Sequence, residues 1–240
     1  MIKSYFNWSG GKDSSLALYH ALKDKNFSIE KLLTSVNQTY GRISMHGVRE
    51  ELLDAQVKEI GIPLQKLMLQ DQPSMSDYEK VLRKNVDQLK EEGFVNSMFG
   101  DIFLEDLKKY REDKLAEVGV SAHFPIWKRD TKELLNEFLD LGFKTILVCV
   151  KSEVLDQSFA GRIINKDFIN DLPDNVDPCG ENGEFHTFVF DGPIFKNPIP
   201  IEIGETVFRE YKQPKNTDDT CNGSSTSHMG FWFTDLTLKK

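Results

Sequence analysis

The sequence SGGKDS occupies residues 9–14, between a strand-like segment at Lys3–Trp8 and a helix-like segment at Asp13–Lys25. A doubly wound sheet places its phosphate ligand at such a junction, where the first strand ends and a helix begins. The two glycines permit positive φ angles and leave the backbone amides open to an anion, and the dipole of the following helix favours negative charge. The stretch therefore predicts a phosphate-binding loop.

The side chains of the loop also suit a nucleotide and its metal ion. Serine hydroxyl groups can donate to phosphate oxygens, and Lys12 adds a positive charge. A carboxylate beside a phosphate is repulsive unless a cation lies between them. Asp13 is therefore the predicted ligand of Mg²⁺, which proteins bind through one or two carboxylates together with substrate phosphates. The loop residues expected to bind ATP are Ser9, Gly10, Gly11, Lys12, Asp13, Ser14 and Ser15.

Strand-like and helix-like segments alternate from this loop to the apolar run KTILVCV at residues 144–150. Strands joined by crossover helices predict an α/β fold with a doubly wound, mainly parallel sheet and helices on both faces. Prolines and β-rich pieces become frequent after residue 152, which predicts a smaller C-terminal α+β part. We accordingly expect an ATP-binding domain at residues 1–151 and a substrate-binding part at residues 152–240.

The composition narrows the classes of partner and the compartment. A net charge of −8 and a pI near 5.2 argue against nucleic acid as a partner, because nucleic-acid binders usually carry a basic surface. The cysteines Cys149, Cys179 and Cys221 are far apart and show no zinc-ligand spacing, which is typical of a reducing compartment. The sequence has no apolar run of the roughly 20 residues that span a bilayer, and its N-terminus does not resemble a signal peptide. We expect a cytoplasmic protein without a membrane partner.

The loop also carries a resemblance to a known group of enzymes. It matches the SGGxDS signature of the PP-loop superfamily, also called the N-type ATP pyrophosphatases, and differs from the Walker loop in the spacing of its glycines. In that superfamily the loop holds pyrophosphate while AMP is transferred to a substrate. The resemblance implies a fold of the PP-loop (HUP) type and an enzyme that splits ATP between its α- and β-phosphates.

A second motif resembles one family within that superfamily. The sequence DPCGENGEFHTFVFDGPIF at residues 177–195 is similar to the C-terminal signature of the diphthine–ammonia ligases, EGGEFETFV followed by D-x-P-L/I-F. Asn182 stands where that family usually has glycine, and His186 stands where it commonly has glutamate. Three shorter stretches agree as well: SMHGVR at 44–49, GDI at 100–102 and PIWKRD at 125–130. The resemblance spans roughly residues 1–200.

This resemblance implies an ATP-dependent amidation. The substrate would be diphthine, a modified histidine of elongation factor 2, with ammonium as the nitrogen source and with AMP and pyrophosphate as products. Glu181 and Glu184 are expected to act with Lys12 and Asp13 as catalytic residues, either steering ammonium or accepting its proton. The expected partners are ATP, ammonium, elongation factor 2 as protein substrate and, in a homodimer, a second copy of the chain.

Four more residues are candidates because of their positions in the sequence. His46 follows the second strand and is expected near the nucleotide. Gly100 and Asp101 lie at a strand end, where a glycine permits close approach of an adenosine. Arg111 is expected to contact the substrate. The complete set of predicted substrate-binding residues is Arg111, Glu181, Glu184 and Thr187.

Three other functions agree with parts of the sequence. A PP-loop enzyme that modifies tRNA is one, although thiolases generally need a cysteine pair and RNA enzymes usually add a basic module. An amidoligase for a different carboxylate is another, because members of the family also occur in bacteria, which do not make diphthamide. The third is a regulator that binds an adenine nucleotide without catalysis. The products formed from ATP distinguish the regulator from the enzymes, and the acceptor distinguishes the enzymes from one another.

Overall fold

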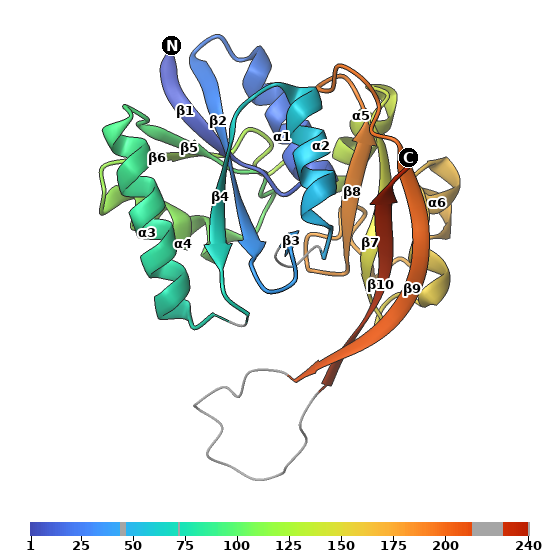
Figure 1. Ribbon diagram of the computed structural model, residues 1–240. Helices are drawn as coiled ribbons and strands as arrows, with labels where there is room; N and C mark the ends of the chain where they lie inside the picture. The colour runs from blue at the N-terminus through green and yellow to red at the C-terminus, as the bar shows by residue number, and fades with distance from the viewer. Residues whose placement is uncertain (44–46, 72, 213–227, 240) are drawn as a thin grey trace.

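The computed structural model describes residues 1–43, 47–71, 73–212 and 228–239. It contains two β-sheets, with helices α1 and α2 between them (Figure 1). The strands of the first sheet, called sheet A, are β1 (Ile2–Asn7), β2 (Phe27–Asn37), β3 (Arg42–Ile43), β4 (Leu64–Leu69), β5 (Asn96–Met98) and β6 (Ser121–His123). The strands of the second, called sheet B, are β7 (Lys144–Lys151), β8 (Phe185–Asp191), β9 (Ile201–Lys212) and β10 (His228–Leu238).

Sheet A is mainly parallel, as predicted. Its parallel strands follow the order β4-β2-β1-β5-β6, and the short β3 pairs antiparallel with the end of β2. The chain passes from β1 outward to β2 and β4 and then returns to the other side of β1 at β5. The strand order therefore reverses between β1 and β5, and open α/β sheets bind their ligands beyond the carboxyl ends of the strands at such a point.

Helices cover both faces of sheet A, which confirms the doubly wound arrangement. The helices of the described residues are α1 (Lys12–Lys23), α2 (Glu50–Ile60), α3 (Met75–Glu91), α4 (Glu105–Ala116), α5 (Thr131–Asp140), the 3-10 helix η1 (Gln157–Phe159) and α6 (Lys166–Asp171), of which η1 and α6 lie beside sheet B (Figure 1). On one face, Leu16 of α1 and Leu52 of α2 join a large apolar core that continues into sheet B. On the other face, Val86 of α3 and Leu115 of α4 belong to a separate apolar cluster. Among the helices of the described residues, none combines the length and the apolar character needed to cross a bilayer.

Sheet B is antiparallel, with the order β8-β7-β10-β9. The apolar run at residues 144–150, which the sequence assigned to the first domain, is β7 and lies at the centre of this second sheet. Both faces of β7 are buried, and a fully covered antiparallel strand shows the same uninterrupted apolar run as a strand of a parallel sheet. A division at residue 151 would separate β7 from the other strands of its sheet, so we propose a boundary that precedes β7.

Hydrogen bonds and ion pairs join sheet B to the first half of the chain. Near the predicted loop, the backbone N–H of Val189 in β8 donates a hydrogen bond of 2.9 Å to the carbonyl of Gly10. At the start of α2, Asp235 of β10 accepts from Arg42 at 2.9 Å and from Arg49 at 2.6 Å. Sheet B is therefore bonded both to the loop and to the start of α2.

Candidate active site

The predicted phosphate loop forms a sharp turn between β1 and α1. Gly10 has a φ of 78°, a left-handed conformation that glycine adopts without a steric penalty. The N-cap residue of α1 is Gly11, and no side chain caps the helix. The hydroxyl groups of Ser14 and Ser15 donate to the Gly11 carbonyl at 3.0 and 2.9 Å, and that of Ser9 donates to Ser14 at 3.0 Å. The serines expected to bind phosphate thus also hold the turn together.

Lys12 is buried and lies between its neighbour in the loop and the C-terminal motif. Its ammonium group is 2.7 Å from each carboxylate oxygen of Asp13 and also donates to the carbonyl of Cys179. Burial would lower the pKa of Lys12, but the charge and hydrogen bond of Asp13, together with Cys179 and Glu181, outweigh burial, so the pKa is raised. For Asp13, burial raises the pKa, and the nearby carboxylate of Asp177 adds to this effect while Lys12 opposes it. The pair therefore lies in a buried and mainly acidic environment.

Glu181 reaches the same region from the C-terminal motif. One of its carboxylate oxygens accepts a hydrogen bond of 2.8 Å from the backbone N–H of Ile102, in the segment that follows β5. Burial raises the pKa of Glu181 to about 7, and the carboxylates of Asp13 and Asp101 act in the same direction, while the hydrogen bond from Ile102 opposes the shift. A carboxyl group that titrates near neutral pH can both give up and accept a proton under working conditions.

Asp101 and Arg111 form an ion pair with unused hydrogen-bonding capacity. Asp101 Oδ1 accepts from Arg111 Nη2 at 3.1 Å. Burial raises the pKa of Asp101, against the opposing charge of Arg111. The other oxygen, Oδ2, and the Nε of Arg111 are buried, and neither has a hydrogen-bond partner among the described residues. Buried polar atoms are almost always paired, so these two atoms are candidates for contact with a bound molecule.

Glu184 has a different environment from Glu181. It is buried, and one carboxylate oxygen accepts from the backbone N–H of Asp177 and from the side-chain amide of Asn182, both at 3.1 Å. These bonds close the turn of the motif on itself. Three residues further on, the hydroxyl of Thr187 accepts a hydrogen bond of 3.0 Å from the backbone N–H of Lys12. Glu184 therefore stabilises the turn of the motif, and Thr187 connects the motif to the loop.

Gly100 is needed for packing between two elements of the first domain. A Cβ atom at this position would lie 2.9 Å from the backbone nitrogen and the Cα of Ser14, closer than real Cβ contacts. The end of β5 thus touches the first turn of α1 directly, which brings Asp101 up to the loop. This contact accounts for the glycine, so adenosine binding is not needed to explain it.

The predicted residues converge on one large cavity, of about 1840 Å³, at the carboxyl ends of the sheet A strands. Its walls also include Thr34, Ser35 and Asn37 of β2 and side chains of α3 and α4. The predicted residues that line it are Ser9, Gly11, Lys12, Asp13, Ser14, Gly100, Asp101, Arg111, Glu181 and Thr187. The predicted residues that do not line it are Gly10, Ser15 and Glu184. His46 lies outside the described residues.

Two residues of the site were not predicted from the sequence. Gln56 of α2 is fully buried, and its amide nitrogen donates to the carbonyls of Gly10 at 3.0 Å and Val189 at 2.6 Å, while its oxygen accepts from Trp8 at 3.1 Å. Asp177 accepts from two backbone N–H groups of the motif turn and from a threonine hydroxyl of α5. The signal for Gln56 was an amide on an otherwise apolar helix face, and the signal for Asp177 was its place at the start of the motif.

Comparison with known families agrees with this geometry. The family described as the diphthamide synthase N-terminal domain matches residues 2–122, and the one described as the diphthamide synthase C-terminal domain matches residues 130–216. The first match covers sheet A with the phosphate loop, and the second contains the motif at residues 177–195. The two halves of the site therefore fall in two domains that are both characteristic of one family.

Proteins with similar sequences include diphthine–ammonia ligases. A diphthine–ammonia ligase of Danio rerio is 26% identical over 227 residues, which cover 83% of this chain and 86% of that protein. A diphthine–ammonia ligase of Schizosaccharomyces pombe is 29% identical over 106 residues, 40% of this chain and 16% of that protein. A solved structure, the U34-tRNA thiolase NcsA from Methanococcus maripaludis with its 4Fe-4S cluster, gives a TM-score of 0.36 at 23% identity over 59% of this chain and 57% of that one. A likeness this small carries no argument.

The mainly parallel sheet, with SGGKDS at its switch point, and the two matching families together indicate an ATP-dependent ligase. Within that class, the chain belongs to the diphthamide synthase family.

Proposed function

We propose that this protein amidates the carboxylate of diphthine on elongation factor 2, using ATP and ammonium and releasing AMP and pyrophosphate. The observation that carries the proposal is the meeting of the phosphate loop with the C-terminal motif at one cavity. Lys12 donates from its backbone to Thr187 and from its side chain to the Cys179 carbonyl, and Glu181 lines the same cavity. ATP and a second reactant can therefore be held beside each other. The relatives' name, diphthine–ammonia ligase, supports the choice of substrate.

The donor set fits a magnesium ion that arrives with the nucleotide. Asp13 and Asp101 line the cavity, and a buried oxygen of Asp101 has no partner among the described residues. The described residues contain no group of three or more His, Cys, Asp or Glu side chains that could hold a metal ion by themselves. Mg²⁺ commonly uses one or two carboxylates and completes its shell with phosphates and water. Bound in this way, it would neutralise the charge that develops on the departing pyrophosphate.

The first chemical step joins the acceptor to AMP. An oxygen of the substrate carboxylate attacks the α-phosphorus of ATP, the bond from that phosphorus to the bridging oxygen breaks, and pyrophosphate leaves. The amides at the start of α1 and the charge of Lys12 stabilise the phosphates during this displacement, which is an electrostatic contribution to catalysis. Lys12 is already fixed by Asp13 and Cys179, so little reorganisation is needed when ATP binds.

The second step transfers nitrogen. Ammonia attacks the carbonyl carbon of the acyl adenylate, AMP leaves with the electrons of the carbon–oxygen bond, and the nitrogen loses a proton. Glu181 is placed to accept that proton, because it lines the cavity and has a pKa of about 7. A base whose pKa lies near the operating pH is efficient in this role. Glu184 does not line the cavity, so its contribution is to hold the turn that presents Glu181.

The described cysteines do not support sulfur transfer, the chemistry of a thiolase. Cys149 and Cys179 are both buried and free. Burial raises the pKa of Cys149 to about 12, and burial likewise raises that of Cys179 despite the opposing charge of Lys12. Both sulfurs are therefore thiols near neutral pH, and a thiolate is the reactive form. Amidation fits these residues better.

The test is chromatographic analysis of the products formed from ATP by the protein with Mg²⁺ and ammonium, with and without elongation factor 2 that carries diphthine. AMP and pyrophosphate formed only with the factor, together with amidated diphthine detected by mass spectrometry, are the expected result. AMP and pyrophosphate formed only with a different carboxylate would keep the ligase and replace the substrate. ADP and phosphate, or no product under any condition, would overturn the proposal in favour of a different ATPase or of a nucleotide-binding regulator.

A further inference from the structure

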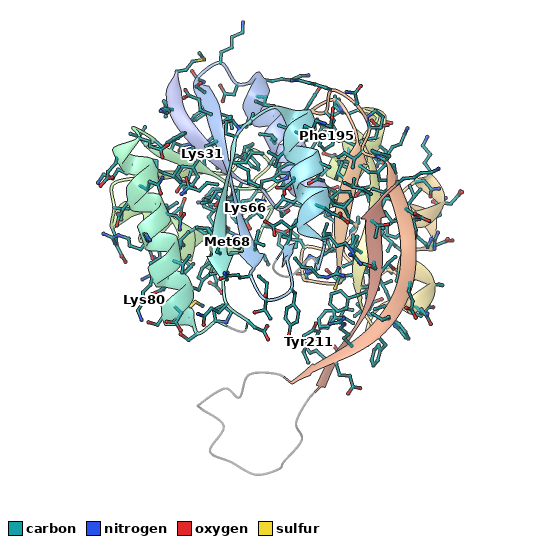
Figure 2. All side chains as sticks on the ribbon, in the orientation of Figure 1. Lys31, Lys66, Met68, Lys80, Phe195 and Tyr211 are labelled. Carbon is teal, nitrogen blue, oxygen red and sulfur yellow. The ribbon has the colours of Figure 1, made fainter. Side chains whose placement is uncertain are left out.

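The cavity of the site continues from the phosphate loop to the space between α3 and α4. Its volume of about 1840 Å³ exceeds the roughly 300–1,000 Å³ of a typical small-molecule pocket, so a bound nucleotide leaves room for a second molecule. Figure 1 shows α3 and α4 together on one side of sheet A, and Figure 2 shows Lys80, a cavity residue of α3, on the side of the molecule away from sheet B. The cavity therefore extends away from the C-terminal part of the chain.

Helix α4 and the residues next to it form one wall of this extension. The residues Leu104, Leu107, Arg111, Lys114 and Val118 line the cavity, and their spacing of three or four positions places them on one helix face. Among the described residues after 152, only some of those between 180 and 187 line the cavity. The space left for a second reactant is therefore bounded largely by the first half of the chain, although the sequence predicts substrate binding after residue 152.

Arg111 is the residue of this wall that best suits a carboxylate. Its Nη2 donates to Asp101 at 3.1 Å, and its Cζ lies 4.3 Å from the centre of the Phe99 ring. These two contacts fix the guanidinium group, while its Nε is buried and has no hydrogen-bond partner among the described residues. A guanidinium presents its donors in a planar fork that matches the two oxygens of a carboxylate. Arg111 is thus oriented in advance and keeps a donor for a bound molecule.

The pair of Arg111 and Asp101 borders the groups that are proposed to carry out the reaction. Burial is the main cause of the raised pKa of Asp101, and the Asp13 carboxylate acts in the same direction. Burial is also the main cause of the raised pKa of Glu181, to which Asp101 contributes. A carboxylate bound to Arg111 therefore lies near both the loop and the proposed base. Each carboxylate oxygen has two lone pairs, so an oxygen that accepts from Arg111 can still attack the α-phosphorus.

We propose that Arg111 binds the carboxylate of the acceptor, and that the acceptor side chain reaches it between α3 and α4. The inference rests on the proposed amidation and names the wall of the cavity that takes the acceptor. Side chains join the two helices here, because the Tyr110 hydroxyl donates to Glu79 at 3.1 Å and Lys114 lies 3.4 Å from the same carboxylate. The side chains of Lys114 and Glu79 are 39% and 37% exposed. Exposed ion pairs contribute little to stability, so an entering side chain can replace these contacts at low cost.

The test is steady-state kinetics of amide formation, with ATP and elongation factor 2 that carries diphthine varied separately. Arg111→Gln should raise the KM for the factor about tenfold or more and change the KM for ATP less than about twofold, because it removes hydrogen bonds between charged groups. Arg111→Lys keeps the charge but loses the planar fork, so its KM should lie between those of wild type and Arg111→Gln. The matched control is Lys109→Gln, since Lys109 is an exposed residue of α4 that does not line the cavity. It should keep both constants.

A second pair of variants tests the route between the helices. Lys114→Trp places a bulky ring on the cavity face of α4 and should raise the KM for the factor severalfold without changing the KM for ATP. Lys109→Trp places the same ring on α4 outside the cavity and should change neither constant. Circular dichroism checks that each variant is folded.

The outcomes separate this inference from the proposed function. An unchanged KM for the factor in Arg111→Gln, a loss confined to kcat, or a rise in the KM for ATP as large as that for the factor would overturn the role of Arg111. Equal KM values for the factor in Lys114→Trp and Lys109→Trp would overturn the route. In each of these cases the wild-type protein still amidates the factor, so the proposed function stands. A wild-type protein that forms no amide on the factor overturns the proposed function, and this inference with it.

Discussion

The phosphate loop and the C-terminal motif adjoin each other at one cavity, but their sequences relate to their roles in different ways. In the loop, five of the seven residues predicted to bind the nucleotide line the cavity, and the exceptions are Gly10 and Ser15. In the motif, two glutamates only three positions apart are separated, because Glu181 lines the cavity and Glu184 is turned into the protein. A short turn with glycines defines its own geometry, whereas the role of a residue in the motif depends on the packing around it.

Residues of β8 and α2 also stabilise the conformation of the phosphate loop. The Gly10 carbonyl accepts from Val189 of β8 and from Gln56 of α2, and the Lys12 backbone N–H donates to Thr187 of β8. The loop is thus fixed from the side of sheet B before any nucleotide binds. Fixed dipoles that need no reorganisation are the ones that contribute most to catalysis. Four substitutions test this division of roles, beginning with the largest expected effect.

Asp13→Ala removes the carboxylate that is proposed to hold Mg²⁺ beside the phosphates. We expect the rate of AMP formation to fall about 10³-fold, the scale that follows from losing a major electrostatic contribution. The fold should be retained, and a far-ultraviolet circular dichroism spectrum checks this. Asp140→Ala, at an exposed aspartate of α5, is the control and should keep its activity. Full activity of Asp13→Ala would show that the loop does not use this carboxylate.

Gln56→Leu tests whether the buried hydrogen bonds of Gln56 stabilise the loop and the segments packed against it. The substitution removes the hydrogen bonds of Gln56 to the Val189 carbonyl and the Trp8 indole N–H, and it leaves the Gly10 carbonyl with the backbone N–H of Val189 alone. We expect the free energy of unfolding to fall by about 2–4 kcal/mol, because each unpaired buried group is costly. Urea denaturation followed by fluorescence measures the change. Gln88→Leu, on the exposed side of α3, should alter stability by less than about 0.5 kcal/mol. Equal midpoints for the two variants would contradict the role given to Gln56.

Glu181→Gln separates the two chemical steps. Pyrophosphate release should continue, while amide formation should slow about 10²-fold, the usual contribution of a general base. In the wild-type protein amide formation should rise as the pH passes about 7, because the carboxyl then loses its proton, and the variant should lack this rise. Rapid-quench measurements of both products test this. Glu184→Gln is the paired variant, and the same selective loss in it would mean that the two glutamates are not divided as proposed.

The raised pKa of Glu181 also predicts a change in stability with pH. Its carboxyl holds a proton in the folded state up to about pH 7 but loses it near 4.5 when unfolded, so the folded state loses stability as the pH rises between these values. The loss has an upper limit of about 3 kcal/mol at roughly 1.4 kcal/mol per pKa unit. Glu181→Gln should remove this part of the pH dependence, which urea titrations at several pH values would detect. An unchanged dependence would show that Glu181 titrates normally.

Asp235→Asn weakens the contact between sheet B and the start of α2, and we expect the smallest effect here. The carboxylate is partly exposed, so a loss of about 1 kcal/mol in the free energy of unfolding is the appropriate scale. Burial would raise the pKa of Asp235, but the hydrogen bonds from Arg49 and Arg42 outweigh it and the pKa is lowered. The stabilisation is therefore present above about pH 4 and is lost as the pH falls through the lowered pKa. A difference between wild type and variant that persists in acid would contradict the ion-pair explanation.

Much of the first half of the molecule could be predicted from the sequence. The alternation of strands and helices and the position of SGGKDS gave the parallel sheet and the place of the loop, because both depend on local patterns. The assignment of residues 144–150 was different, since a strand with both faces covered looks the same in either kind of sheet. The antiparallel pairing of this strand with β8 and β10 shows which sheet it belongs to, and both partners are distant in sequence.

The roles of individual residues likewise depend on contacts with segments that are distant in sequence. Gly100 was expected to make room for a nucleotide, which stays a prediction because the residue lines the cavity, and the structure adds that it makes room for the backbone of Ser14. Close approach of a nucleotide and close approach of a backbone segment both require a glycine, so the residue type alone does not distinguish them. Gln56 gave only a weak signal, because an amide within an apolar helix face does not reveal which distant backbone groups it will meet.

The class of chemistry could be predicted from the loop residues, since a glycine turn at a helix start, with its lysine and aspartate, favours a phosphate through local backbone geometry and charge. The tertiary structure was needed to show which acidic side chain of the motif lines the cavity, Glu181 rather than Glu184. It also decided that β7 belongs to sheet B and that β9 remains an open edge. These outcomes depend on contacts between segments far apart in the chain, and such contacts are set by the packing of whole sheets and helices against one another.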